Sequence, residues 1–288
     1  MIKAMLHTIR IQDKLKNILI FLPLFFDSGI NIVKTVDLIF GFILFFFLTN
    51  VIYIINDFSD FEKDKINQLK KYKINKKLSY LILIISILSI LFLYLYKVEI
   101  FNKYFYLYIF VFLSYNFFFK NYKYLDVILL GSFYIIRIYY GFEIYEKLEI
   151  SIGFSIFFLI LFIYLAFIKK YIQISVNSFD ISKKIIPYNL KDIPKIKKIN
   201  FFLSSVNIIL LFLFIIHIYF MNISYLFLLE IKNSPLEIFS FFAFFILFII
   251  KSNQILNKLP KKDIISIYLY DFKFVLSFVL LILVFLIS

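Results

Sequence analysis

Long apolar runs separated by short polar segments dominate this chain. A helix that crosses a bilayer needs about 20 mostly apolar residues, because in lipid its backbone polar groups must bond to one another. The runs therefore predict an all-α polytopic membrane protein with about nine transmembrane helices. They cover roughly residues 17–33, 37–56, 78–96, 101–119, 124–142, 151–169, 200–221, 236–251 and 265–287. No linker or internal repeat divides the chain, so residues 1–288 are expected to form a single integral-membrane domain.

The composition agrees with a membrane protein and narrows the chemistry. Hydrophobic residues make up 63% of the chain and the mean hydropathy is +0.93, whereas soluble domains are about 45–50% apolar. The chain contains no cysteine. A disulfide, a thiolate metal site and a thiol nucleophile are therefore excluded.

The net charge of +14 follows the predicted topology. Of the 32 basic residues, 25 lie in the N-terminal segment and in four loops on the same side of the nine spans: 57–77, 120–123, 169–198 and 251–262. Loops rich in lysine and arginine remain in the cytoplasm. The N-terminus is therefore expected inside and the C-terminus outside the cytoplasmic membrane. The remaining positive charge suits membrane lipid and anionic substrates as partners, and it does not point to nucleic acid.

A cluster of acidic residues follows the second apolar run, at its cytoplasmic end. Asp57, Asp60 and Asp64 are spaced i, i+3 and i+7, which places them on one face of a helix. Carboxylates crowded in this way repel each other unless they share a cation. Mg²⁺ usually binds through one or two carboxylates together with substrate phosphates. The spacing predicts a Mg²⁺-diphosphate site, and a solvated, charged helix end is the alternative.

Other polar residues are expected at the same membrane face. Asp126 begins the fifth run, and Arg137 lies eleven residues later at nearly the same helical angle, roughly 16 Å deeper. A charge at that depth is a candidate functional residue, although a structural salt bridge is equally open. Gly141, one turn on, would allow close helix approach. Lys169 and Gln173 share a helix face at the end of the sixth run, where ordinary stop-transfer lysines are the alternative.

The acidic cluster resembles a known family motif. Residues 56–64 read Asn-Asp-x-x-Asp-x-x-x-Asp, like the NDxxDxxxD signature of the UbiA superfamily of intramembrane prenyltransferases. The resemblance extends to its decaprenyl-phosphate phosphoribosyltransferase branch. Residues 10–17 are similar to that branch's RPxxWxKN, with Ile11 for proline and Lys14 for tryptophan. Residues 67–74 match its HPxKxxRP at Lys70, with Lys73 in place of arginine.

Further matches to this branch continue along the chain. The series Y…LK…D…R…G is similar to Tyr115, Lys120, Asp126, Arg137 and Gly141, and KRxxE is similar to residues 169–173 with lysine for arginine and glutamine for glutamate. Tyr188 matches a tyrosine in the following loop. Prenyltransferases with aromatic acceptors carry a second DxxxD motif in this loop. Here Asp180 has no aspartate four residues away, which favours the phosphoribosyl branch.

The resemblance implies a nine-helix bundle whose site opens to the cytoplasm. It implies Mg²⁺ held by Asp57, Asp60 and Asp64, and catalysis by Asp57, Asp60, Asp126 and Arg137. It implies substrate contacts by Asn56, Arg10, Lys16, Asn17, Lys70, Lys73, Lys120, Lys169, Lys170, Gln173 and Tyr188.

The expected enzyme is a transferase that moves 5-phosphoribose from phosphoribosyl pyrophosphate to a polyprenyl phosphate. The alternative within the family is transfer of a polyprenyl group from its diphosphate to an acceptor such as 4-hydroxybenzoate. The alternative from a different class is a transporter or a non-catalytic membrane protein.

Overall fold

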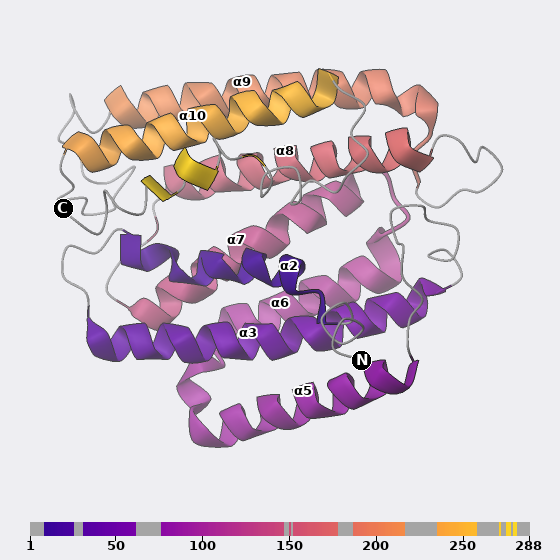
Figure 1. Cartoon of the computed structure of the whole chain (residues 1–288), viewed down its shortest axis with the longest axis vertical. Helices are drawn as coiled ribbons and strands as arrows, with labels where there is room; N and C mark the ends of the chain where they lie inside the picture. Colours follow the sequence, from indigo (N-terminus) through magenta and orange to yellow (C-terminus); the bar gives the residue numbers. More distant parts are fainter. Residues whose placement is uncertain are drawn as a thin grey trace. The chain divides into compact units, whose positions relative to one another are not determined.

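The computed structural model describes the chain in separate stretches, and it is helical in nearly all of them (Figure 1). The described residues are 9–25, 31–61, 76–146, 150, 152–177, 187–216, 235–257, 271, 275–277 and 279–280. Within them five helices are long and apolar enough to cross a membrane. This confirms the predicted all-helical class and fits a multi-pass membrane protein. Nine spans and the orientation of the termini remain predictions.

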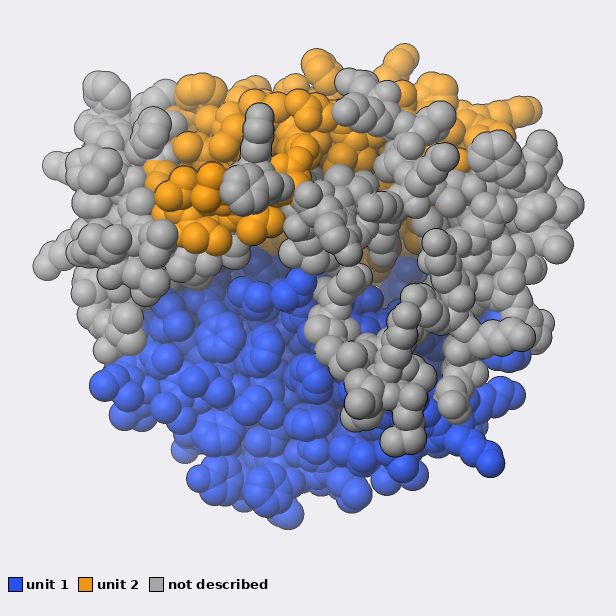
Figure 2. All heavy atoms as spheres, viewed as in Figure 1, with its two compact units in different colours: residues 1–24, 29–120, 136–148 blue, residues 25–28, 121–135, 149–288 orange. Residues whose placement is uncertain are grey.

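The chain forms two compact units, coloured separately in Figure 2. Unit 1 consists of residues 1–24, 29–120 and 136–148, and unit 2 of residues 25–28, 121–135 and 149–288. Helix α7 (Leu125–Tyr145) begins in unit 2 and ends in unit 1. Each unit has its own buried core, described in turn below.

Unit 1 is built around α3 (Ile32–Ser59), which packs against α5 (Lys76–Tyr96). Phe45 of α3 is fully buried against the rings of Tyr108 and Tyr140. The other elements are α2 (Ile11–Lys14), η1 (Leu15–Phe25), η2 (Val98–Ile100), α6 (Lys103–Ser114) and the π-helical turn η3 (Tyr115–Phe119). The short α6 together with η3 accounts for the apolar run predicted at 101–119.

Close helix approach at Gly141 is present in unit 1, as the sequence predicts. A Cβ placed on Gly141 would overlap the backbone oxygen of Ile20, so η1 passes directly against α7 there. Segment η1 contains Pro23, whose missing N–H is consistent with a departure from regular α-helix. The glycine therefore fixes the path of the N-terminal segment, which carries Arg10, Lys14 and Asn17.

Unit 2 contains α8 (Ile152–Asn177), η4 (Leu190–Asp192), α9 (Ile193–Ile216) and α10 (Pro235–Asn257). Helix α8 packs against both α9 and α10. The Tyr164 hydroxyl donates to Asn253 Oδ1 of α10 at 2.9 Å. Helix α8 continues about two turns past the predicted end at residue 169, because Tyr171, Ile172 and Ile174 extend its buried face. Lys169 and Gln173 therefore lie within a helix.

Candidate functional site

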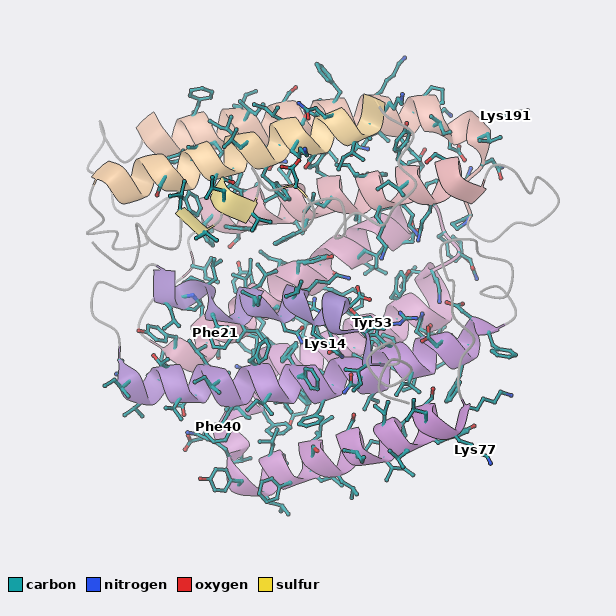
Figure 3. The ribbon with its side chains drawn as sticks, viewed as in Figure 1. Lys14, Phe21, Phe40, Tyr53, Lys77 and Lys191 are labelled. Carbon is teal, nitrogen blue, oxygen red and sulfur yellow. The ribbon has the colours of Figure 1, made fainter. Side chains whose placement is uncertain are left out.

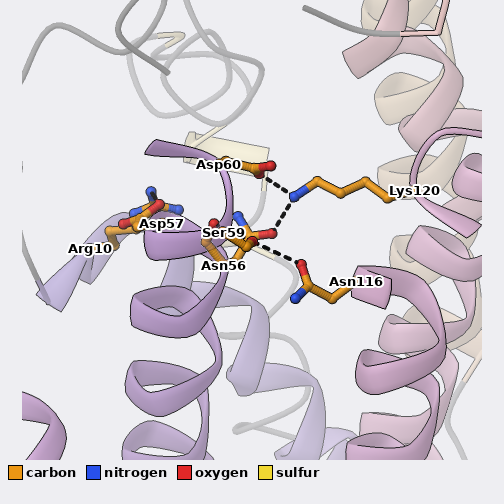
Figure 4. Close-up of polar contacts among 7 residues, drawn as sticks. All are labelled: Arg10, Asn56, Asp57, Ser59, Asp60, Asn116 and Lys120. Atoms are coloured by element: carbon orange, nitrogen blue, oxygen red, sulfur yellow. Dashed lines mark hydrogen bonds and ion pairs between the residues drawn. The ribbon is translucent and has the colours of Figure 1, made fainter. Parts of the chain in front are cut away.

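The aspartates of the acidic cluster lie at the C-terminal end of α3 (Figure 4). Asp57 is in the last turn, and Asp60 is the C-cap residue whose N–H bonds to Asn56 O at 3.0 Å. A helix C-terminus carries partial negative charge, so carboxylates there need compensating cations. Arg10 forms an ion pair with Asp57, and Lys120 forms one with Asp60. Each of the two carboxylates thus has its own cation.

Neutral polar groups complete this end of α3. Lys120 Nζ also donates to Asn56 Oδ1 at 2.6 Å, which ties η3 to α3 through two side chains of one helix turn. The Ser59 hydroxyl lies 3.3 Å from Asn116 Oδ1 and donates to Asn56 O at 2.9 Å. The predicted residues Arg10, Asn56 and Lys120 therefore meet the aspartates in unit 1. Figure 4 shows Arg10 beside Asp57 on one side of the helix end, and Lys120 beside Asp60 on the other.

The donor set at this helix end suits a hard divalent cation that also binds phosphate. Asp57 and Asp60 supply two carboxylates, which matches the one or two that Mg²⁺ usually takes from a protein when substrate phosphates complete its shell. Within the described residues no three acidic or histidine side chains gather around one point. The predicted third ligand, Asp64, and the predicted phosphate contacts Lys70 and Lys73 lie outside the described residues.

Below the aspartates, unit 1 contains a buried polar network that begins at Lys14. This side chain is 4% exposed, and its Nζ donates to Thr49 Oγ1 at 2.7 Å and to Phe46 O at 3.2 Å. Asn17 is fully buried, and its Nδ2 lies 3.5 Å from the same Thr49 oxygen. Thr49 in turn donates to Phe45 O at 2.7 Å. Lys14 therefore contacts a buried polar residue of α3, Thr49, about two helical turns before Asp57.

Arg137 joins this network from α7. Its Nε donates to Asn17 Oδ1 at 2.9 Å, its Nη2 bonds to the Tyr108 hydroxyl, and its guanidinium lies 4.8 Å from the centre of the Tyr108 ring. The side chain is 2% exposed. The structure thus brings together two of the predicted residues, Arg137 and Asn17, deep in unit 1. The predicted Lys16 instead forms an ion pair with Asp13 at 2.6 Å.

Burial also affects the charge state of Lys14, which directly precedes the apolar segment η1. Its pKa is lowered from the ordinary 10.5 to about 7, chiefly because burial penalises the ammonium form. Asp13 opposes the change, and nearby positive charges reinforce it: Arg137, Arg10 and Lys16. Lys14 is thus a buried amine that gains or loses its proton near neutral pH.

Unit 2 has a second polar cluster at the start of α7. Asp126 is fully buried, forms an ion pair with Lys170 at 2.7 Å and accepts a hydrogen bond from the Tyr188 hydroxyl at 2.7 Å. The Tyr188 oxygen accepts from Tyr124 N, also at 2.7 Å. Burial and the neighbouring Asp126 carboxylate raise the pKa of Tyr188, so it remains a hydrogen-bond donor. Three predicted residues, Asp126, Lys170 and Tyr188, therefore form one contact group.

Two lysines flank the ring of Tyr188. Lys170 Nζ lies 5.8 Å and Lys123 Nζ 6.0 Å from its centre. Lys123 also forms an ion pair with Asp192 of η4 at 2.7 Å. These cation–ring contacts hold the residues before η4 against the start of α7. The predicted Gln173 is not in this group, and its buried Oε1 accepts no hydrogen bond from the described residues.

Sequence reasoning missed Lys14, Thr49, Tyr108 and Lys123. A weak signal existed for two of them. Lys14 follows Arg10 by four residues, the spacing at which side chains share a helix face. Thr49 precedes Asp57 by eight residues, which places the two about 80° apart around a helix. Nothing in the sequence shows that these two faces meet.

The helices and these clusters describe an all-helical, multi-pass membrane protein with polar groups gathered at helix ends. No family model matches the chain. Over 185 residues it is 28% identical to uncharacterized protein y4nM of Sinorhizobium fredii (strain NBRC 101917 / NGR234), a match that covers 60% of this chain. The chain spans about a third of that relative, as the match covers 34% of it.

Proposed function

We propose that this protein is a Mg²⁺-dependent membrane transferase of the UbiA type. Its expected reaction moves 5-phosphoribose from phosphoribosyl pyrophosphate to a polyprenyl phosphate. The observation that carries the proposal is the end of α3, where Asp57 and Asp60 are each joined to a cation, Arg10 and Lys120. This arrangement supplies ligands for a metal ion and for the phosphates that accompany it.

Bound Mg²⁺ would neutralise the negative charge that builds on the departing pyrophosphate. Asp57 and Asp60 are the residues that would hold it. The ribose C1–O bond to pyrophosphate breaks, and a bond from C1 to a lipid phosphate oxygen forms. That oxygen is already anionic, so the reaction needs no strong general base.

In this proposal Arg10 and Lys120 of unit 1 also bind phosphate. With Asp57 and Asp60 holding a metal ion, Arg10 and Lys120 would turn the donors that now bind these carboxylates to pyrophosphate oxygens. Arg10 offers a planar fork suited to two oxygens, whereas Lys120 acts as a compact point charge.

The proposal includes the cytoplasmic membrane, about nine spans, a cytoplasmic N-terminus and a site that opens to the cytoplasm. It rests on the lysine-rich loops at one side of the predicted spans. Reporter fusions after residues 70 and 182 are expected to report a cytoplasmic position. A fusion that reports the outside at either point would contradict this topology.

Matched aspartate variants test the site. Asp57→Asn and Asp60→Asn are expected to lower Mg²⁺-dependent turnover at least about a hundredfold, because an amide is a poor ligand for a hard cation. The control is Asp37→Asn, the same change near the opposite end of α3, where Asp37 pairs with Lys97. The control is expected to retain turnover per folded molecule. Full activity in either test variant would refute the metal-site proposal.

A further inference from the structure

In the part of the chain that the structure describes, the buried Lys14 has no ion-pair partner. Among the described residues its only contacts through Nζ are Thr49 Oγ1, Phe46 O and the faces of the Phe46 and Tyr53 rings. The nearest carboxylate in sequence, Asp13, is paired with Lys16. Burying an unpaired charge is costly, so such a group either loses its proton or is matched by an opposite charge.

Arg10 lies one helical turn before Lys14 and shares its aromatic neighbour. The Arg10 guanidinium is 5.3 Å and Lys14 Nζ is 5.1 Å from the centre of the Tyr53 ring. Figure 3 shows Lys14 and Tyr53 close together, with Lys14 in the N-terminal segment and Tyr53 on α3. The Arg10 side chain is 22% exposed, so this pair of cations extends from a partly open position to a closed one.

Within the described residues neither cation uses all of its hydrogen-bond donors. A guanidinium has five N–H donors and an ammonium has three. Within the described residues Arg10 uses its Nη2 on Asp57, and Lys14 donates to two oxygens. The charged groups around Lys14 are mostly positive: Arg10, Lys16 and Arg137 against Asp13. Unused donors in a positive field suit an anion with several oxygens.

We propose that Lys14 and Arg10 form a phosphate subsite beside Tyr53, which binds a phosphate-bearing ligand without a metal ion. The ligand is a phosphate monoester or diphosphate, whose oxygens accept from both side chains. Arg10 receives the anion at the partly exposed position, and Lys14 holds it from below. This inference goes beyond the proposed reaction and does not depend on it, because binding is expected in the absence of Mg²⁺ and of turnover.

The subsite has a characteristic pH dependence. Lys14 carries its charge below about pH 7 and loses it above. An anion prefers the ammonium form, so affinity is expected to fall as the pH rises. Sulfate is the suitable probe because its charge is constant between pH 6 and 8.5, whereas phosphates titrate in this range.

The experiment measures binding of radiolabelled sulfate to the purified full chain in detergent with EDTA. The wild type is expected to bind roughly tenfold more tightly at pH 6 than at pH 8.5. Lys14→Met is expected to weaken binding at pH 6 roughly tenfold to hundredfold and to remove most of the pH dependence. Lys14→Arg keeps a fixed charge, so its affinity is expected to be nearly the same at both pH values.

The matched control is Lys77→Met, at an exposed lysine near the start of α5 (Figure 3). It removes the same charge from the same unit and is expected to bind sulfate as the wild type does. The proposal is overturned if wild-type affinity does not change with pH, or if the change persists in Lys14→Met. A thermal unfolding scan of each variant verifies folding, and Lys14→Arg serves if Lys14→Met does not fold.

Competition then identifies the source of the phosphate. Inorganic pyrophosphate and a short-chain polyprenyl phosphate in mixed micelles are each titrated against bound sulfate at pH 6. Displacement by pyrophosphate alone assigns the subsite to a soluble substrate, and displacement by the lipid alone assigns it to a lipid headgroup. Failure of both to displace sulfate would overturn the phosphate assignment. Loss of Mg²⁺-dependent turnover in Asp57→Asn with sulfate binding retained would separate the two proposals.

Discussion

Replacing Lys14 by methionine is expected to stabilise the protein below about pH 10. The side chain is 4% exposed and lies among Phe46, Thr49 and Tyr53. Methionine keeps a similar unbranched length and has no charge to bury. Replacement of a buried charge by an apolar group of similar volume is often neutral or stabilising. The subsite proposed at Lys14 would thus be retained at a cost in stability.

The magnitude follows from the pKa of Lys14. The pKa is about 7 in the folded protein against an ordinary 10.5, and each pH unit corresponds to about 1.4 kcal/mol. The ammonium form is therefore disfavoured in the folded state by about 5 kcal/mol. Between about pH 7 and 10.5 the unfolded chain binds the proton and the folded chain does not. The free energy of unfolding then rises with pH, by up to about 1.4 kcal/mol per unit.

The assay is thermal unfolding of the wild type and of Lys14→Met in one detergent at pH 6, 7, 8 and 9. The wild-type midpoint is expected to rise with pH above 7 relative to that of the variant. The variant is expected to unfold at a higher temperature at pH 6 and 7, with a difference that shrinks as the pH rises. A variant less stable than the wild type at pH 7, or a constant difference across the series, would refute the reasoning.

Three further substitutions test other contacts. Arg137→Lys is expected to lower the free energy of unfolding by about 1 to 3 kcal/mol. The reason is that a lysine cannot bond to both Asn17 and Tyr108 as the planar guanidinium does. An unchanged thermal unfolding midpoint would argue against the network. Gly141→Ala is expected to cost about 1 to 3 kcal/mol, since its Cβ would overlap the backbone of η1, and a wild-type melting curve would contradict that packing. Tyr188→Phe removes a donor to buried Asp126 and an acceptor for a backbone N–H, and a lower thermal midpoint of similar size is expected.

The helices and the acidic end of α3 could be predicted from the sequence because both depend on local pattern. Apolar runs of sufficient length form helices in lipid, and the i, i+3 spacing places Asp57 and Asp60 together. The close approach at Gly141 was also predictable, since a missing side chain is visible in the sequence. The exact end of α8 was not, because the lysines at 169 and 170 look like a stop, although the helix runs to Asn177 and its buried face continues at least to Ser175.

The partners of the polar residues could not be predicted, because they depend on which helix faces meet. The pairing of Arg10 with Asp57, and of Lys14 with Thr49, follows from the path of the N-terminal segment along α3. Lys14 occupies a position where the family that the chain resembles has tryptophan, so the family pattern gave no role for a cation there. Only its burial in the structure marks Lys14 as a candidate functional residue.

The central claim is tested most directly by product formation. Purified protein is incubated with Mg²⁺, phosphoribosyl pyrophosphate and decaprenyl phosphate, and in parallel with a polyprenyl diphosphate and 4-hydroxybenzoate, and the lipid fraction is analysed by mass spectrometry. A 5-phosphoribosylated lipid phosphate is expected from the first mixture, with release of pyrophosphate, and EDTA is expected to abolish both. Product from the second mixture alone would identify a prenyltransferase instead, and the absence of any lipid product from a folded protein in both mixtures would contradict the transferase account.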